Sequence, residues 1–424
     1  MTVPPAPRQS FPGLISLLRN GAALFAGAGG EAVIRGVYAI AIGVWIGASD
    51  YGLWSYILTL YAAILVATSF GIETSLEARG GRGVQAAREF IDRSLGLRLL
   101  SLVFASLVIA AIGVTRAEES LGPLYLLAIP AVLGRGVATW NRSVLTAREA
   151  AVRALRVGLP IRLAELATGL ALLLSGYGLP TLLVVHGLSW LAEAGWGLAA
   201  VRRELPDMRP RFDRLHRLLT GQDLSVWGTV VGLAILNAIP VLLAKEVDLP
   251  LSDLGNLAMA LQVATFMVIG VQAFMSAAFP VLGRAAVRSD PKLVTYAWGS
   301  VVLVCMATAL LFLGSRFFGE SLLTVLLGPD FVLAGQLLPL AIVLAGLVLA
   351  PIGLWQVLVV RGTASAGAFA VALGVAAAAG AVLISGPRLD PAEVLLVACC
   401  GWGARLVVIL VAFVREPAGG QNPT

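Results

Sequence analysis

The feature that most constrains this chain is a series of apolar stretches, each about 20 residues long, that recurs from one end to the other. One α-helix needs a stretch of that length to cross the hydrocarbon core of a bilayer. Hydrophobic residues make up 58% of the 424 residues and charged residues only 13%, which leaves too little polar surface for a water-soluble fold. We therefore predict an all-α polytopic membrane protein with about twelve transmembrane helices and no room for a soluble catalytic domain.

The apolar stretches also give the expected positions of the helices. The predicted spans cover residues 20–47, 51–78, 94–114, 122–146, 157–176, 180–200, 218–244, 254–282, 293–314, 336–360, 364–385 and 392–413. The apolar stretch 320–335 is broken by Gly328-Pro329-Asp330 and is too short to cross, so we expect an interfacial helix there, on the periplasmic side.

Basic residues are distributed very unevenly between the two sides of the predicted helices. Twenty of the 30 lie on one side, and only Arg116, Lys245, Arg316 and Arg388 lie on the other. Because cytoplasmic loops carry the excess of lysine and arginine, both termini and the basic segment 201–217 are predicted to be cytoplasmic. The net charge of +6 is thus explained by orientation in the bilayer, and we expect no nucleic-acid partner.

The chain carries a trace of internal duplication. Residues 201–217 form the longest charged stretch and divide an N-terminal six-helix lobe (1–200) from a C-terminal one (218–424). The first turn of each half carries a similar tag, Ser49-Asp50-Tyr51-Gly52 and Ser252-Asp253-Leu254-Gly255. Six spans per half is an even number, so the two lobes are predicted to be parallel repeats related by pseudo-twofold symmetry, with a substrate site between them.

The same turn carries a family resemblance. Three segments carry it: Gly47-Ala-Ser-Asp-Tyr-Gly52 with Leu53-Trp-Ser-Tyr56 after it, Ser69-Phe-Gly71, and Leu326-Leu-Gly-Pro-Asp-Phe331. They resemble segments of the polysaccharide (O-antigen or capsule, Wzx-like) flippases, which belong to the multidrug/oligosaccharidyl-lipid/polysaccharide exporter superfamily. The resemblance implies a flippase in the bacterial inner membrane. Its substrate would be a polyprenyl-pyrophosphate-linked oligosaccharide, moved to the outer leaflet by alternating access, driven by membrane potential or by H⁺ or Na⁺ exchange. Its partners would be membrane lipids and polysaccharide polymerases or glycosyltransferases.

Charged residues inside the predicted spans point to the functional site, since such residues face a partner or a hydrated cavity. The arginines concerned are Arg35, Arg98, Arg135, Arg142, Arg162 and Arg405. Arg35 can pair with Glu31, and Arg162 with Glu165, at helical spacings of four and three. Guanidinium groups suit a pyrophosphate, so we predict a cationic substrate cavity formed by Arg35, Arg135, Arg142 and Arg162. Purely structural ion pairs remain the alternative.

Other polar residues in the spans have two interpretations each. His186, Ser189 and Glu193 share one face of a helix. We predict that transport is coupled to an ion through four residues: Glu31, Glu165, His186 and Glu193. The alternative for the face that carries His186 and Glu193 is a polar stripe that forms hydrogen bonds to a neighbouring helix.

The remaining span residues are predicted to anchor or bend helices. Arg98 and Arg142 lie near the cytoplasmic boundary, where snorkelling is expected. For Arg405, alone in the last span, a structural contact between the lobes and a functional role are equal alternatives. Gly30, Gly36 and Pro240 are predicted hinges, with close helix packing as the alternative for the glycines.

The sequence lacks the motifs of several kinds of enzyme and metal site. Neither Lys245 nor Lys292 follows a glycine-rich loop, so no P-loop is present, and no HExxH or Cys/His cluster occurs. We therefore predict that the chain is not an enzyme and binds no metal or cofactor. Two rival functions stay open: a multidrug or cation antiporter using Glu31, Glu165 and Glu193, and a membrane glycosyltransferase or ligase, for which Glu246-Val-Asp248 would be the acidic pair.

Overall fold

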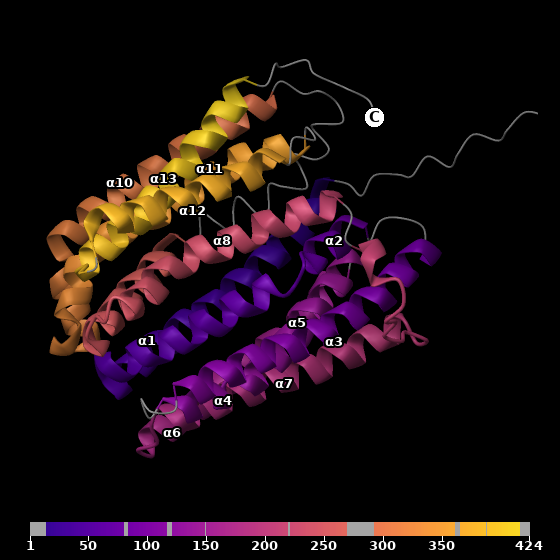
Figure 1. Cartoon of the computed structure of the whole chain (residues 1–424), viewed down its shortest axis with the longest axis horizontal. Helices are drawn as coiled ribbons and strands as arrows, with labels where there is room; N and C mark the ends of the chain where they lie inside the picture. The colour runs from indigo at the N-terminus through magenta and orange to yellow at the C-terminus, as the bar shows by residue number, and fades with distance from the viewer. Residues whose placement is uncertain are drawn as a thin grey trace, which may run out of the picture.

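The computed structural model describes residues 14–79, 84–116, 121–148, 150–218, 221–268, 292–360, 365–386 and 388–415. Within these ranges the regular secondary structure is entirely helical, and the helices pack as two bundles side by side (Figure 1). The N-terminal lobe contains α1 (Leu14–Ala67), α2 (Ile72–Arg79), α3 (Val84–Thr115), α4 (Gly122–Leu127), α5 (Ile129–Ala147), α6 (Ala151–Leu174) and α7 (Leu179–Glu204), followed by the short helix η2 (Leu215–Leu218). The C-terminal lobe contains α8 (Gly221–Glu246), an unlabelled helix over Leu251–Val268, α10 (Lys292–Leu327), η3 (Pro329–Phe331), α11 (Val332–Val360), α12 (Ser365–Ser385) and α13 (Pro391–Arg415).

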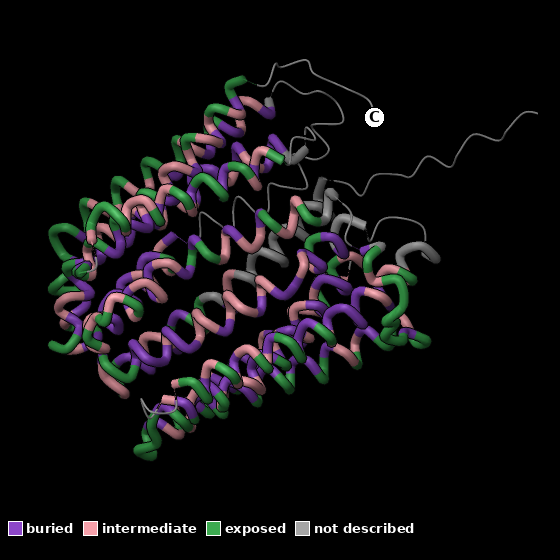
Figure 2. Tube along the Cα trace, in the orientation of Figure 1, coloured by how far each residue is buried: buried purple, intermediate pink, exposed green. Residues whose placement is uncertain are grey.

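The outer faces of both bundles are largely exposed (Figure 2), and many of the exposed side chains are apolar. On α10, for example, Leu310 is 74% exposed and Phe317 is 75% exposed. Side chains of this kind belong in lipid, which agrees with the composition of the chain.

The helix α1 reverses direction at Gly47, whose φ of 77° lies in the region that favours glycine. Arg35 and Tyr61 would lie about 39 Å apart in a straight helix. Instead, the Arg35 guanidinium lies 5.9 Å from the Trp190 ring, and the Tyr61 hydroxyl lies 2.7 Å from Nε2 of His186, which also bonds to Trp190. α1 is therefore a hairpin of two helices.

The prediction of about twelve spans is confirmed. The described residues contain 11 helices long and apolar enough to cross a membrane, and α1 supplies two spans where the helix assignment has one. The eighth predicted span, 254–282, is described only as far as Val268.

Two details of the predicted helices are wrong. The interfacial helix expected at 320–335 does not exist, because α10 continues to Leu327 and the chain turns through Gly328 (φ 94°) and η3 directly into α11. The second span also ends earlier than predicted, at Ala67, where a turn with φ 53° at Phe70 and 65° at Gly71 separates it from α2. In both places the turn interrupts an apolar run, so hydropathy alone cannot reveal it.

The two duplicated tags pack directly on each other. A Cβ placed on Gly52 would lie 2.3 Å from the Leu251 carbonyl oxygen, and one placed on Gly255 would lie 1.8 Å from the Ala48 carbonyl oxygen. The backbones of the two lobes therefore touch at this point, which only glycine permits. We call these four residues the glycine seam.

Candidate functional site

A cavity of about 820 Å³ lies between the two lobes, within the usual size range of pockets for small organic ligands. Its two walls differ in chemistry. The N-terminal lobe contributes its lining carboxylates, arginines and histidine: Glu31, Arg35, Arg135, Arg162, Glu165 and His186. The C-terminal lobe contributes apolar residues with the amides Asn237 and Gln262 and the indole Trp402. The cavity is therefore polar on one side and largely apolar on the other.

Glu31 is the first node of a buried charge network. Arg35 forms an ion pair with it at the predicted spacing of four. Arg142 binds it from α5 in a bidentate manner, with Nη1 and Nη2 each 3.1 Å from one carboxylate oxygen. The side chains of Glu31, Arg142 and Arg35 are 10%, 29% and 47% exposed, so Arg35 is the most open of the three. The carboxylate of Glu31 is thus already neutralised by two arginines.

Glu193 and Glu165 extend the network along α6 and α7. Nε of Arg142 donates to Glu193 at 2.7 Å, and Nη2 of Arg162 donates to the other oxygen of Glu193 at 2.8 Å. Arg162 also pairs with Glu165, as its spacing predicts. Ser189 donates to Glu165 at 2.8 Å. All three glutamates of the network therefore have an arginine partner.

His186 closes the network on the cavity side. Its Nδ1 lies 2.6 Å from Oε1 of Glu165, and its Nε2 lies 3.1 Å from the indole nitrogen of Trp190. An indole nitrogen can only donate, so Nε2 is the acceptor and Nδ1 carries the proton that is donated to Glu165. The hydroxyl of Tyr61 lies 2.7 Å from the same Nε2. The hydrogen-bond pattern thus assigns one neutral tautomer to His186.

Arg135 is the exception to this pairing. Among the described residues, no carboxylate lies within ion-pair distance of it. Its Nη1 donates to the Tyr61 hydroxyl at 3.4 Å, and its guanidinium lies 5.6 Å from the Tyr61 ring and 5.5 Å from the Trp190 ring. Aromatic faces attract a cation but do not neutralise it. Arg135 lines the cavity and brings a positive charge there, and its role in binding a substrate stays a prediction.

Three other arginines differ from expectation. Arg142 does not line the main cavity; it lies behind it between two glutamates. Arg98 does not snorkel, because its side chain is 2% exposed and it binds Glu73 at 2.8 Å and the Gly136 carbonyl at 3.0 Å. Arg405 is buried on α13 at 5.0 Å from the Trp402 ring, and its Nε and Nη1 find no hydrogen-bond partner in the described chain. The partners of Arg142 and Arg98 come from other helices, which spacing along one helix cannot predict.

The proposed hinges have different surroundings. A Cβ on Gly36 would lie 2.7 Å from the Phe266 ring of the other lobe, which favours the packing interpretation. A Cβ on Gly30 would meet only Leu159, at 3.8 Å. Pro240 lies inside α8 and lines the cavity. The only non-helical backbone within α1 is at Gly47, so bending at Gly30 and Gly36 stays a prediction.

Sequence reasoning missed the aromatic part of the site. Tyr61 and Trp190 both contact His186 and Arg135, yet in sequence nothing distinguishes them from the other aromatic residues of the same helices. The spacing of four between His186 and Trp190 was the available signal. Of the acidic pair considered for a glycosyltransferase, Glu246 binds Arg116 at 3.1 Å.

Comparison of the whole structure with solved structures identifies the architecture. The chain is similar to an inward-facing multidrug resistance MATE family transporter of the MOP superfamily, with a TM-score of 0.64 and 15% identity over 94% of this chain and 96% of that one. It is similar to the eukaryotic MATE transporter AtDTX14, with a TM-score of 0.62 and 14% identity over 96% of this chain and 97% of that one. The fold is that of the MATE transporters.

A third solved structure with this fold differs in the charge of its pocket. It is a MOP superfamily transporter from Pyrococcus furiosus, described as having a binding pocket of reverse polarity that suggests a different function; the TM-score is 0.64 with 14% identity over 95% of this chain and 97% of that one. By sequence alone, no family model and no curated protein matches the chain. The expected all-α fold is thus confirmed, whereas the likeness to the Wzx-like flippases stays a resemblance.

Proposed function

We propose that this chain is an alternating-access transporter that exports an amphipathic organic molecule. The MATE fold, the cavity between the lobes and the sealed glycine seam at one end support this proposal. The resemblance to multidrug resistance transporters favours a multidrug-type exporter over the lipid-linked sugar flippase implied by the sequence motifs. The largely apolar C-terminal wall suits the apolar part of such a substrate.

The charge of the substrate is the finer part of the proposal. A transporter of organic cations needs a carboxylate that is free to bind them, and here Glu31 and Glu165 in the cavity wall are each bound to arginine. Among the described arginines that line the cavity, Arg135 is the one without a carboxylate partner. This single observation favours an anionic headgroup, such as a carboxylate or phosphate, because a guanidinium binds both strongly.

An efflux assay tests the charge preference. Cells expressing the chain are loaded with matched anionic and cationic fluorescent amphiphiles, and export is followed in wild type, Arg135→Ala and Arg135→Lys. We expect Arg135→Ala to lower export of the anionic dye by about tenfold, the effect of losing one charge-assisted hydrogen bond, and Arg135→Lys to retain part of it. Arg388→Ala, which changes an exposed arginine outside the cavity, is the control. Unchanged export of the anionic dye by Arg135→Ala would refute the assignment.

A lipid-linked pyrophosphate is the second candidate substrate. Arg135 with the half-exposed Arg35 favours it, since two guanidinium groups on one wall suit a doubly charged head. An inside-negative potential would assist export of such a head by about 2.3 kcal/mol per charge per 100 mV. Arg35→Ala and Arg135→Ala, expressed at wild-type level, should then fail to restore surface polysaccharide in a flippase-null bacterium. Full restoration by both variants would exclude this substrate.

Ion coupling through the charge network belongs to the same proposal. Glu31, Glu165, His186 and Glu193 are contiguous through Arg142 and Arg162, so a proton or Na⁺ that displaced one arginine would affect the others. Transport driven in proteoliposomes by a pH gradient, a Na⁺ gradient or a potential alone distinguishes the three driving forces. If a membrane potential alone drives transport, these residues do not couple transport to an ion.

A further inference from the structure

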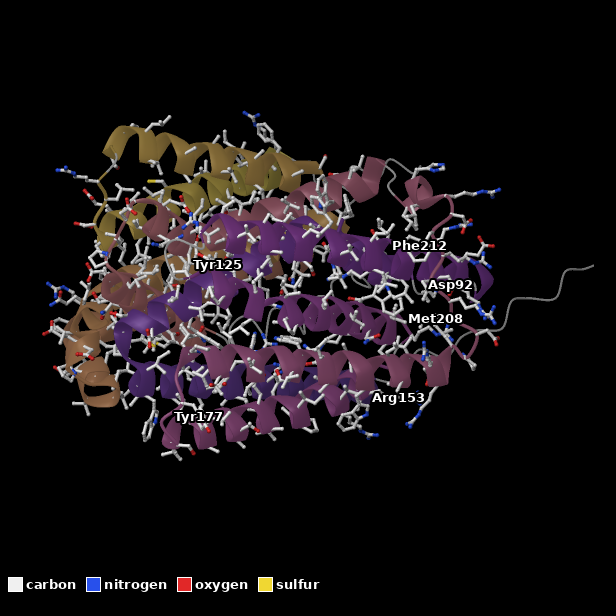
Figure 3. All side chains as sticks on the ribbon, turned by 60° about the horizontal axis from the view of Figure 1, so that its bottom comes forward. Asp92, Tyr125, Arg153, Tyr177, Met208 and Phe212 are labelled. Atoms are coloured by element: carbon white, nitrogen blue, oxygen red, sulfur yellow. The ribbon has the colours of Figure 1, made fainter. Side chains whose placement is uncertain are left out.

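The linker between the lobes is docked on the N-terminal lobe. Its buried residue Met208 packs among apolar side chains of that lobe, and the Asp92 carboxylate of α3 accepts a hydrogen bond from the backbone of Arg209 at 3.2 Å. The Asp92 carbonyl accepts another from the backbone of Arg211 at 2.9 Å. Gly96 makes the approach possible, since a Cβ there would lie 2.0 Å from the Arg211 carbonyl oxygen. Figure 3 shows Asp92, Met208 and Phe212 at the same end of the molecule.

This docking uses the acidic residues near the linker and leaves its arginines without carboxylates. Glu204 pairs with Arg153, Asp207 with Arg88 at 3.2 Å, and Asp213 with Arg93 at 3.5 Å. All three partners belong to α3 or α6. In the described chain, no carboxylate within ion-pair distance remains for the exposed residues Arg202, Arg203, Arg209 and Arg214, and Arg211 reaches only Asp92 at 3.9 Å. The linker therefore presents a fixed and concentrated positive charge.

An aromatic side chain lies among these arginines. Phe212 is 54% exposed although its neighbours in sequence, Arg211 and Asp213, are tied to the lobe. On α7, Trp196 is 51% exposed and lies about 10 Å along the helix from Arg203. Aromatic residues of this kind gather at the headgroup level of a bilayer. The arginines thus stand at the depth where lipid headgroups lie.

We propose that the arginines of the linker and of the last turn of α7, together with Phe212, form a docking surface for anionic phospholipid headgroups of the adjacent leaflet. The positive charge complements the lipid phosphates, and Phe212 inserts beside the acyl chains. Each basic residue near an anionic membrane surface strengthens binding by about fivefold. Because the linker backbone is already held on α3, little ordering opposes binding.

Native mass spectrometry of the full chain tests the proposal, with phosphatidylglycerol or phosphatidylcholine as the titrated lipid. The variant combines Arg209→Gln, Arg211→Gln and Arg214→Gln. The matched control combines Arg116→Gln, Arg316→Gln and Arg388→Gln, which remove the same charge from the opposite side of the predicted topology. Three single variants provide the measurement if the triple variant folds poorly: Arg209→Gln, Arg214→Gln and Phe212→Ser. The last of these keeps every charge.

We expect the triple linker variant to lose affinity for phosphatidylglycerol by about fivefold per arginine, while the control triple retains it. Phe212→Ser should weaken binding without changing its salt dependence. Three results would overturn the proposal: equal affinity of the wild type for phosphatidylcholine, equal loss in the control triple, or unchanged binding by every linker variant. Complete displacement of the lipid by millimolar inorganic phosphate or by a polyglutamate peptide would also overturn it, because the surface would then be a site for a soluble anion or an acidic protein.

Discussion

The glycine seam allows a direct prediction about the conformational equilibrium. In Gly255→Ala, the new Cβ would lie 1.8 Å from the Ala48 carbonyl oxygen and 3.1 Å from the backbone nitrogen of Gly52. Ordinary carbon–oxygen contacts lie at about 3.3 Å or more, so the two helices must separate by about 1.5 Å. The obstructing atom belongs to the backbone and cannot rotate away.

The cost follows from the overlap. Overpacking by one methyl group at a tight contact typically costs about 1–3 kcal/mol. A value of about 2 kcal/mol lowers the population of the state with a sealed seam about thirtyfold relative to any state with the seam open. Gly255→Ala is therefore expected to shift the protein towards the conformation in which the lobes have parted at this end.

Distance measurement by double electron–electron resonance checks this shift. In a background with Cys305, Cys399 and Cys400 replaced by serine, spin labels on Ser49→Cys and Asp330→Cys, both exposed and on opposite lobes, report the separation at the seam. Gly403→Ala is the control, because a Cβ there meets no atom within 4 Å. The distribution should move to longer distances in Gly255→Ala only. If it coincides with that of wild type while transport is unaffected, the seam is not a contact that opens, and the reasoning fails.

Three further predictions concern stability and docking. Glu193→Gln removes one carboxylate partner from both Arg142 and Arg162, and each arginine keeps one other carboxylate. The free energy of unfolding in detergent should therefore fall by about 2 kcal/mol. An unchanged free energy of unfolding would contradict the charge network. Asn256 donates to the Asp330 carbonyl at 2.9 Å and accepts from the backbone of Ala334, in the first turn of α11, at 2.8 Å. Asn256→Leu should therefore lower the free energy of unfolding by about 2 kcal/mol in the same assay. A change near zero would show that η3 is held by other contacts. Gly96→Ala should release the linker, which trypsin cleavage between the lobes would detect as a faster cut than in wild type; an equal rate would argue against the docking.

The sequence predicts the coarse fold because the bilayer imposes a strong and local requirement. Each span needs about 20 apolar residues wherever it lies in the chain, so the number and type of the helices can be read without knowing their neighbours. The i,i+4 pair Glu31–Arg35 and the i,i+3 pair Arg162–Glu165 are local in the same sense, and both form. The tag repeated in the two halves was also visible, and it marks the point where the lobes touch.

Contacts between helices were decided only by the tertiary structure. Arg142 receives its two carboxylates from α1 and α7, Arg98 receives Glu73 from α2, and Tyr61 reaches His186 across 125 residues of sequence. Helical spacing contains no information about such partners. Which arginine of the described cavity lining stays without a carboxylate therefore depends on how the helices pack. The apolar runs determine that this chain crosses the membrane, and packing determines that Arg135 is that arginine, the residue that we propose binds a substrate.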